Sequence, residues 1–123
     1  MTEFKATRAK LYLLRTEEGG RKNDGFGTGY HGMVCWSSQQ PDPKSDTFND
    51  VFVLIEGKEW CQLGEECMAE LTFVFPEAVP DILRVGKEFN LVEGPHVVAR
   101  GTIVELLKQP HFWPDWVRRH YGK

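Results

Sequence analysis

The chain has 123 residues, which is enough for one domain around a single core and too few for a nucleotide-binding domain plus another. Hydrophobic residues at 41% and charged residues at 27% are ordinary for a globular protein, and no apolar run is long enough to span a bilayer as a helix. A net charge of −3 argues against broad, non-specific nucleic-acid binding, although a local basic patch remains compatible with it.

The N-terminus and the cysteines indicate the cellular compartment. Residues 1–8 lack the apolar core of a signal peptide. The three cysteines, Cys35, Cys61 and Cys67, are an odd number without the spacing of a disulfide framework. We therefore expect reduced thiols, a cytoplasmic protein and no membrane partner.

Extended runs and turn signals alternate along the chain. The first predicted strand covers residues 6–15 and ends in a turn at 17–20. One of its faces carries Ala9, Leu11 and Leu13, and the other carries Lys10, Tyr12 and Leu14. Further strands are predicted over residues 30–36, 51–55, 68–75, 88–92 and 97–106. Residues 37–49, polar and with two prolines, are predicted to form a surface loop, and Leu71, Phe73 and Phe75 to share one strand face.

Short strands at this spacing, with little helical periodicity, indicate an antiparallel barrel or sandwich. The end of the chain differs, because residues 108–123 are aromatic and basic and Pro114 suits the first turn of a short helix. The aromatic residues of this extension either plug one end of the barrel or form an interaction surface, and both readings are compatible with exposed Arg118 and Arg119.

Residues 27–32 read G-x-G-x-x-G, a pattern also found in phosphate-binding loops. A dinucleotide loop needs a buried strand before the glycines and a helix directly after them. Here polar residues 21–24 precede the glycines, and a predicted strand follows them. We therefore interpret the glycines as an inter-strand connection that needs positive φ angles or close backbone passage.

Neither a metal site nor a catalytic site is assembled in the sequence. Cys61 and Cys67 are too far apart for the paired-ligand spacing of structural zinc sites. The carboxylate pairs 17–18 and 65–66 are sequence neighbours, whose side chains need not converge, and the serines lack a nucleophile elbow. We expect no bound metal, no cofactor and no enzymatic activity.

Several short motifs follow one another in a fixed order along residues 6–107. The first strand leads into Glu17–Arg21 (E-E-G-G-R) and then Gly29-Tyr30. Later come 88–94 (E-F-N-L-V-E-G) and 98–104 (V-A-R-G-T-I-V). This order resembles the third, C-terminal β-barrel domain of bacterial elongation factor Tu, which has R-F-x-x-R-E-G and V-G-x-G-V-V at the last two places.

The resemblance implies an all-β fold, a closed antiparallel Greek-key barrel of about six strands over residues 1–107, with a short C-terminal helical extension over 108–123. The glycine-rich stretch would be the first inter-strand connection. In the family this loop helps to hold the acceptor and T stems of aminoacyl-tRNA. Nucleotide chemistry belongs there to a separate G domain, so the resemblance implies no GTP binding by this chain alone.

The departures from the family pattern concern charge. Lys22 replaces a histidine and His31 an arginine, while Glu88 and Val92 stand where the family has arginines. Losing cations weakens contacts with phosphates, because nucleic-acid affinity is mostly attraction between cations and phosphates.

Two functional hypotheses follow. The first is a non-catalytic binding module of the translation apparatus, which binds tRNA or a translation-related protein. Its predicted contacts are Arg21, Lys22, Tyr30, His31 and His96. The second is an interaction decoy or immunity protein that neutralises a toxin or effector recognising this barrel, which the acidic net charge and the lost arginines favour.

Overall fold

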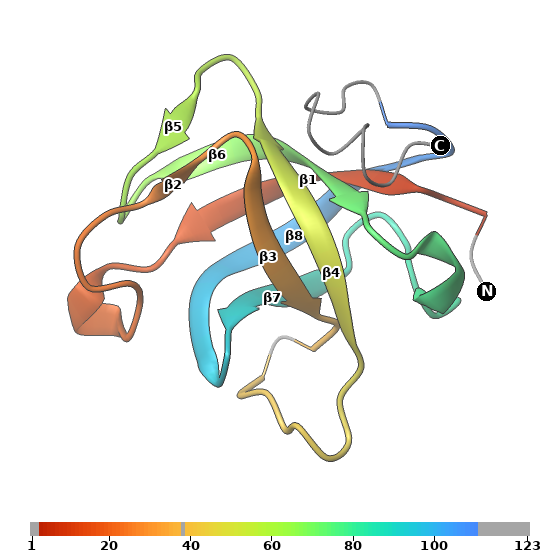
Figure 1. Cartoon of the computed structure of the whole chain (residues 1–123), viewed down its shortest axis with the longest axis horizontal. Helices are drawn as coiled ribbons and strands as arrows, with labels where there is room; N and C mark the ends of the chain where they lie inside the picture. The colour runs from red at the N-terminus through yellow and green to blue at the C-terminus, as the bar shows by residue number, and fades with distance from the viewer. Residues whose placement is uncertain (1–2, 38, 111–123) are drawn as a thin grey trace.

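The fold is a closed antiparallel barrel of six strands, in the spatial order β1-β6-β4-β3-β7-β8 (Figure 1). It is seen in a computed structural model that describes residues 3–37 and 39–110. The barrel strands are β1 (Ala6–Leu13), β3 (Tyr30–Cys35), β4 (Phe48–Ile55), β6 (Glu66–Phe73), β7 (Glu88–Glu93) and β8 (His96–Leu107). Two short strands, β2 (Phe26–Gly27) and β5 (Trp60–Cys61), pair as a separate ribbon, and the 3-10 helices are η1 (Thr16–Glu18) and η2 (Pro76–Ala78).

The connectivity closes the barrel without leaving a free strand edge. β3, β4 and β6 are consecutive neighbours, and β7 returns through residues 74–87 to lie beside β3, which is a Greek-key arrangement. β8 pairs with β7 on one side and with β1 on the other. Register shifts interrupt both pairings, and such bulges increase strand curvature. Closure gives every barrel strand a hydrogen-bonded neighbour on each side.

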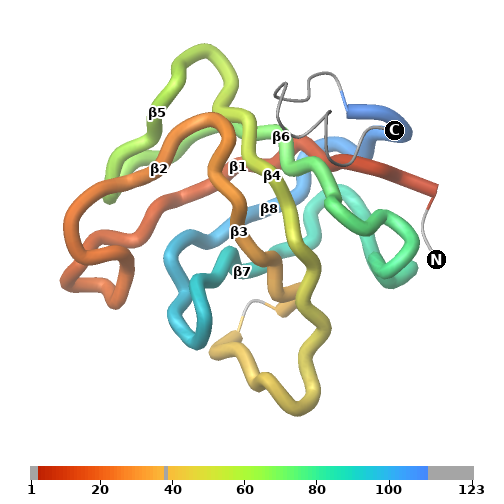
Figure 2. Tube along the Cα trace, in the orientation of Figure 1, coloured from red at the N-terminus to blue at the C-terminus, as the bar shows by residue number. Residues whose placement is uncertain are grey.

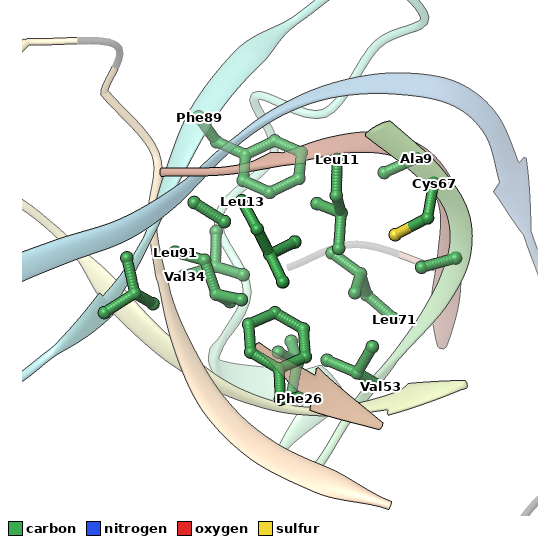
Figure 3. Close-up of a cluster of buried hydrophobic side chains, with 14 of the residues drawn as sticks. Ala9, Leu11, Leu13, Phe26, Val34, Val53, Cys67, Leu71, Phe89 and Leu91 are labelled. Atoms are coloured by element: carbon green, nitrogen blue, oxygen red, sulfur yellow. The ribbon is translucent and has the colours of Figure 1, made fainter. Parts of the chain in front are cut away.

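The core fills the barrel with the apolar faces of its strands (Figure 3). Ala9, Leu11 and Leu13 are fully buried, so the predicted inward face of the first strand is confirmed. The Trp36 ring meets the Phe89 ring edge-on, with centroids 5.6 Å apart. Gly101 lies under that ring, because a Cβ placed there would stand 2.2 Å from Phe89 Cζ.

Two predictions about side-chain direction are wrong. Leu14 was expected on the outer face but is 5% exposed, because it follows the end of β1 and its N–H bonds the Val98 carbonyl at 3.0 Å. Phe75 was expected to share the inner face of Leu71 and Phe73 but is 49% exposed. β6 ends at Phe73, and the chain then turns into η2, so the alternation of the strand no longer applies.

The six predicted strands are confirmed, with shifted boundaries. β4 begins at Phe48 rather than at Val51, so Asn49 belongs to a strand and not to the predicted surface loop. Asn49 is buried because its side-chain oxygen accepts a hydrogen bond from Trp36 Nε1 at 2.6 Å, deep beside the core. The loop before it contacts β7, where Asn90 Nδ2 donates to the Gln39 carbonyl at 2.8 Å.

The glycine motif lies between strands and not before a helix. Gly27 is in β2, Gly29 has a φ of 97° in the turn that follows, and Gly32 is buried within β3. This confirms the inter-strand interpretation, since the helix N-terminus that a phosphate loop uses is not formed after these glycines. The β2–β5 ribbon itself was not predicted, because two-residue strands leave no periodicity in a sequence.

The remaining expectations concern thiols and the end of the chain. Cys35, Cys61 and Cys67 are all buried free thiols. The predicted short helix of the extension 108–123, with Pro114 in its first turn, falls with Trp113 and the other aromatic residues in 111–123 and so lies outside the described residues. Within the described ranges, none of the helices has the length and apolar character to cross a membrane.

Candidate functional site

The connection from β1 to β2 is built by η1 and two glycines. The Glu18 carboxylate accepts hydrogen bonds from the Tyr12 hydroxyl at 2.6 Å and from the Arg15 N–H at 2.8 Å, and these bonds lower the pKa of Glu18. Gly19 then adopts a φ of 94°, which ends η1 in the left-handed region that glycine tolerates. Together these contacts confirm the predicted turn and send the following residues back toward the barrel.

Arg21, one of the five predicted contacts, is held by three neighbours. Its Nε lies 3.3 Å from Glu93 Oε2, and its Nη1 donates to the Gly25 carbonyl. The guanidinium carbon stands 5.6 Å from the centroid of the Tyr30 ring. A cation at this distance from an aromatic face is attracted by the ring quadrupole. The structure thus uses Arg21 partly to fasten its own loop onto the β7 end.

Tyr30 completes this arrangement. Its ring stacks on Phe26 with centroids 4.1 Å apart and planes 6° from parallel. Its hydroxyl donates a hydrogen bond to Glu93 Oε2, so Glu93 receives both Tyr30 and Arg21. Burial, and then the neighbouring Glu93 carboxylate, raise the pKa of the Tyr30 phenol well above its usual value. Tyr30 therefore acts as a neutral brace for Arg21.

A groove of about 600 Å³ runs beside this cluster, and we call it the Lys22 groove. Its lining comes from the β1–β2 connection and from the turn between β7 and β8. Both segments lie at the same end of the barrel (Figure 2). Three of the predicted contacts line it: Arg21, Lys22 and His96. Lys22 and His96 are exposed. Asp24 and Glu93 line the same groove, so its two fixed cations face two carboxylates.

The neighbouring surface extends this groove toward Arg100. A smaller hollow of about 270 Å³ shares Gly19 and His96 with the Lys22 groove and reaches Arg100 and Gln39. Arg100 is exposed there, and its charge contributes to the low pKa of Glu18. Arg100 and His96 therefore lie close to the β1–β2 connection.

His31 does not join the Lys22 groove. It follows Tyr30 on β3, so its side chain projects from the opposite face of the strand. There its ring lies 4.7 Å from the Phe52 ring, and its Nε2 lies 3.9 Å from Asp50 Oδ2. Four of the five predicted residues are thus gathered at one end of the barrel, with Tyr30 as a brace, and His31 lies on the outer face of β3 and β4.

A second, larger groove was missed by sequence reasoning. It has a volume of about 940 Å³, and we call it the Trp60 groove. Its lining includes Phe26, Tyr30 and Ile55 on the floor and Lys58 and Trp60 at the rim, while Arg21 borders both grooves. Trp60 is 46% exposed on the β2–β5 ribbon. The sequence offers no signal for it, because only the pairing of Gly27 with Trp60 brings the indole to this surface.

In the part of the chain that the structure describes, no set of side chains is arranged to bind a metal ion. Over residues 3–37 and 39–110, no three or more His, Cys, Asp and Glu side chains group as a metal site would require. Cys61 and Cys67 interact with each other, but burial raises the pKa of both thiols, most strongly for Cys67. Both are buried residues of the core.

Comparison with known proteins supports the resemblance found in the sequence. No protein-family model matches the chain. The chain is 33% identical over 101 residues to the chloroplastic elongation factor Tu of Coleochaete orbicularis. The alignment covers 81% of this chain but 22% of that protein, so the chain spans about a fifth of the length of the relative. Together with the closed six-stranded barrel, this similarity confirms that the chain resembles the β-barrel domain of elongation factor Tu.

Proposed function

We propose that this chain is a non-catalytic binding module of the translation apparatus in the cytoplasm, and that the Lys22 groove is its contact surface for tRNA. The observation that carries the proposal is the gathering of Arg21, Lys22 and His96 in one groove of a barrel similar to elongation factor Tu. The groove is formed by the loop that carries the E-E-G-G-R motif. Cations on a rigid, closed barrel are suited to fix a phosphate backbone without sequence readout.

The charges of the groove set the expected strength of binding. Arg21 is engaged by Glu93, so Lys22 and His96 are the side chains best placed to meet phosphates. Each phosphate that a cation neutralises contributes a slope of roughly −0.9 to the dependence of log affinity on log salt concentration. We therefore expect a shallow slope of about −1 to −2, in place of the steep dependence of proteins with many phosphate contacts.

The test is fluorescence anisotropy with end-labelled tRNA, at salt concentrations from about 50 to 200 mM. Lys22→Ala should weaken binding roughly three- to tenfold and reduce the slope by about one unit. Lys108→Ala is the matched control, because it removes an exposed cation that follows the end of β8 and lies outside the groove. Equal effects of the two substitutions, or affinity independent of salt, would remove the support for tRNA binding.

A second function is favoured by one observation, the balance of two fixed cations against two carboxylates in the Lys22 groove. A neutral groove suits a protein partner, as in a decoy or immunity protein that a toxin or effector recognises. Purification of the tagged protein from its native cells separates the two proposals. A single stoichiometric protein without RNA supports the decoy, and tRNA that washes off with moderate salt supports the translation module.

A further inference from the structure

The Trp60 groove combines an apolar, aromatic floor with cations at its rim. Its floor is apolar and aromatic, with Phe26 and Ile55 buried and a half-buried Tyr30 stacked on Phe26. Trp60 stands at the rim with 46% of its surface exposed. Tryptophan is among the residues most enriched at the energetic centre of protein interfaces, because it offers a large, rigid and amphipathic contact.

The indole is held in place before any partner binds. Trp60 pairs with Gly27 in the β2–β5 ribbon, and a Cβ on Gly27 would stand 2.8 Å from Trp60 Cε3. The ring therefore lies against the Gly27 backbone, where any larger residue would displace it. The ribbon is also fixed to its surroundings, because Thr28 N–H donates to the Glu59 carbonyl and the Ile55 N–H donates to Thr28 Oγ1, each at 3.0 Å. A preorganised platform loses little conformational entropy when it binds.

The charges at the rim select the chemistry of the partner. Arg21 and Lys58 line the groove together with a single carboxylate, Glu59, so the groove carries a net charge of +1 on a chain whose net charge is −3. A partner with a carboxylate beside an apolar side chain is complementary to this pattern. Lys58 Nζ lies 2.7 Å from Glu65 Oε2 and Arg21 is paired with Glu93, but both pairs are accessible to solvent, where an ion pair contributes little. A carboxylate of a partner can therefore share either cation.

We propose that the Trp60 groove binds an extended peptide segment of a protein partner, in which an acidic residue neighbours an aromatic or aliphatic one. The apolar side chain lies on the floor against the Trp60 indole, and the carboxylate meets Lys58 at the rim. This site is separate from the proposed tRNA contact. Arg21 borders both grooves, whereas Trp60 and Lys58 line only this one and Lys22 and His96 line only the other.

The experiment is selection of random heptapeptides displayed on phage against the full chain, with counter-selection on Trp60→Ala. The selected sequences are then synthesised and their affinities measured by fluorescence anisotropy. We expect a consensus that joins Asp or Glu to Phe, Trp, Leu or Ile. Trp60→Ala should weaken the selected peptide roughly tenfold or more, as for other central tryptophans. Lys58→Glu should weaken it by repelling the carboxylate, and circular dichroism checks that each variant is folded.

Lys22→Ala is the matched control for the neighbouring groove and should leave peptide affinity unchanged. The proposal is overturned if no peptide is selected, if the consensus is basic, or if the selected peptides bind equally well to Trp60→Ala and Lys58→Glu. It is also overturned if an oligouridine decamer, and no peptide, binds in a Trp60-dependent way, because that result identifies a single-stranded RNA site. The tRNA proposal fails instead if Lys22→Ala leaves tRNA affinity unchanged. The two proposals can therefore fail separately.

Discussion

Glu93 partly neutralises the positive charge of Arg21 and so limits the attraction of Arg21 for a phosphate. The effect of Glu93→Gln on tRNA affinity measures this limit. The carboxylate lies 3.3 Å from Arg21 Nε and accepts the hydrogen bond of Tyr30. Glutamine has nearly the same shape and keeps an oxygen that can accept from Tyr30, but it has no charge. The substitution therefore releases Arg21 without removing the brace that positions it.

The expected changes in stability and affinity have opposite signs. The ion pair is exposed, with side chains 33% and 40% accessible, so its loss costs less than about 1 kcal/mol of unfolding free energy. Removal of one negative charge about 7 Å from a bound phosphate contributes about 0.6 kcal/mol to binding in a water-like dielectric. That corresponds to roughly a threefold gain in tRNA affinity at low salt. The salt slope should steepen by about 0.9, because Arg21 can then neutralise one more phosphate.

The assay is the tRNA anisotropy titration, paired with a thermal melt followed by circular dichroism. Glu77→Gln is the control, since Glu77 carries the same charge in η2, on the opposite side of the molecule from η1 (Figure 1). A gain in affinity for Glu93→Gln alone supports the assignment of Arg21 to the binding surface. If both variants gain equally, the effect is one of net charge. If Glu93→Gln binds tRNA less well, Glu93 orders the loop more than it competes with phosphate, and the electrostatic reasoning is refuted.

Two further predictions concern the core and the pH dependence of stability. Gly101→Ala should lower the unfolding free energy by about 1–3 kcal/mol in a urea titration, because the new Cβ would meet the buried Phe89 ring. The double variant Gly101→Ala with Phe89→Leu should recover part of the loss. An unchanged urea midpoint for Gly101→Ala would contradict this packing. The raised pKa of Tyr30 means that the folded chain holds the phenol proton more tightly than the unfolded chain does, so this contribution to stability is complete below pH of about 10 and is lost as the pH rises further. Between pH of about 9.5 and 11.5, the melting temperature of the wild type should therefore fall more than that of Tyr30→Phe, and parallel falls would show that Tyr30 does not titrate with unfolding.

The barrel could be predicted because its signals are local and repeated. Alternation in β1 places Ala9, Leu11 and Leu13 inside, and the structure buries all three. The two errors of direction, at Leu14 and Phe75, both lie just beyond a strand end. At such points the chain leaves the period of two, and hydrogen bonds to other segments decide where a side chain goes.

The site could be predicted only in part, because it depends on contacts between distant segments. Lys22 and His96 are 74 residues apart and meet only because the β7–β8 turn lies beside the first loop. Nothing in the sequence marks Glu93 or Trp60 as a residue of a binding site. Glu93 matters through its contacts with Tyr30 and Arg21, and Trp60 matters through a ribbon of two-residue strands. Neither arrangement has a period that a single sequence can display.

Val92 and Glu88 stand at two positions where the family pattern has arginines, and the structure shows what each does there. Val92 is 1% exposed and pairs with Met33 and Val97, so this position now belongs to the core and not to a cationic surface. Glu88 is exposed beside Arg100 in a hollow about 250 Å³ in volume, where it offsets that cation. Neither position lines the Lys22 groove or the Trp60 groove, and the Trp60 groove carries a net charge of +1 over an apolar floor. A partner that uses both grooves would receive its phosphate contacts from Lys22 and His96 and its apolar contacts from Trp60. Measuring tRNA and peptide affinity in Lys22→Ala and Trp60→Ala side by side tells whether one partner or two explain this surface.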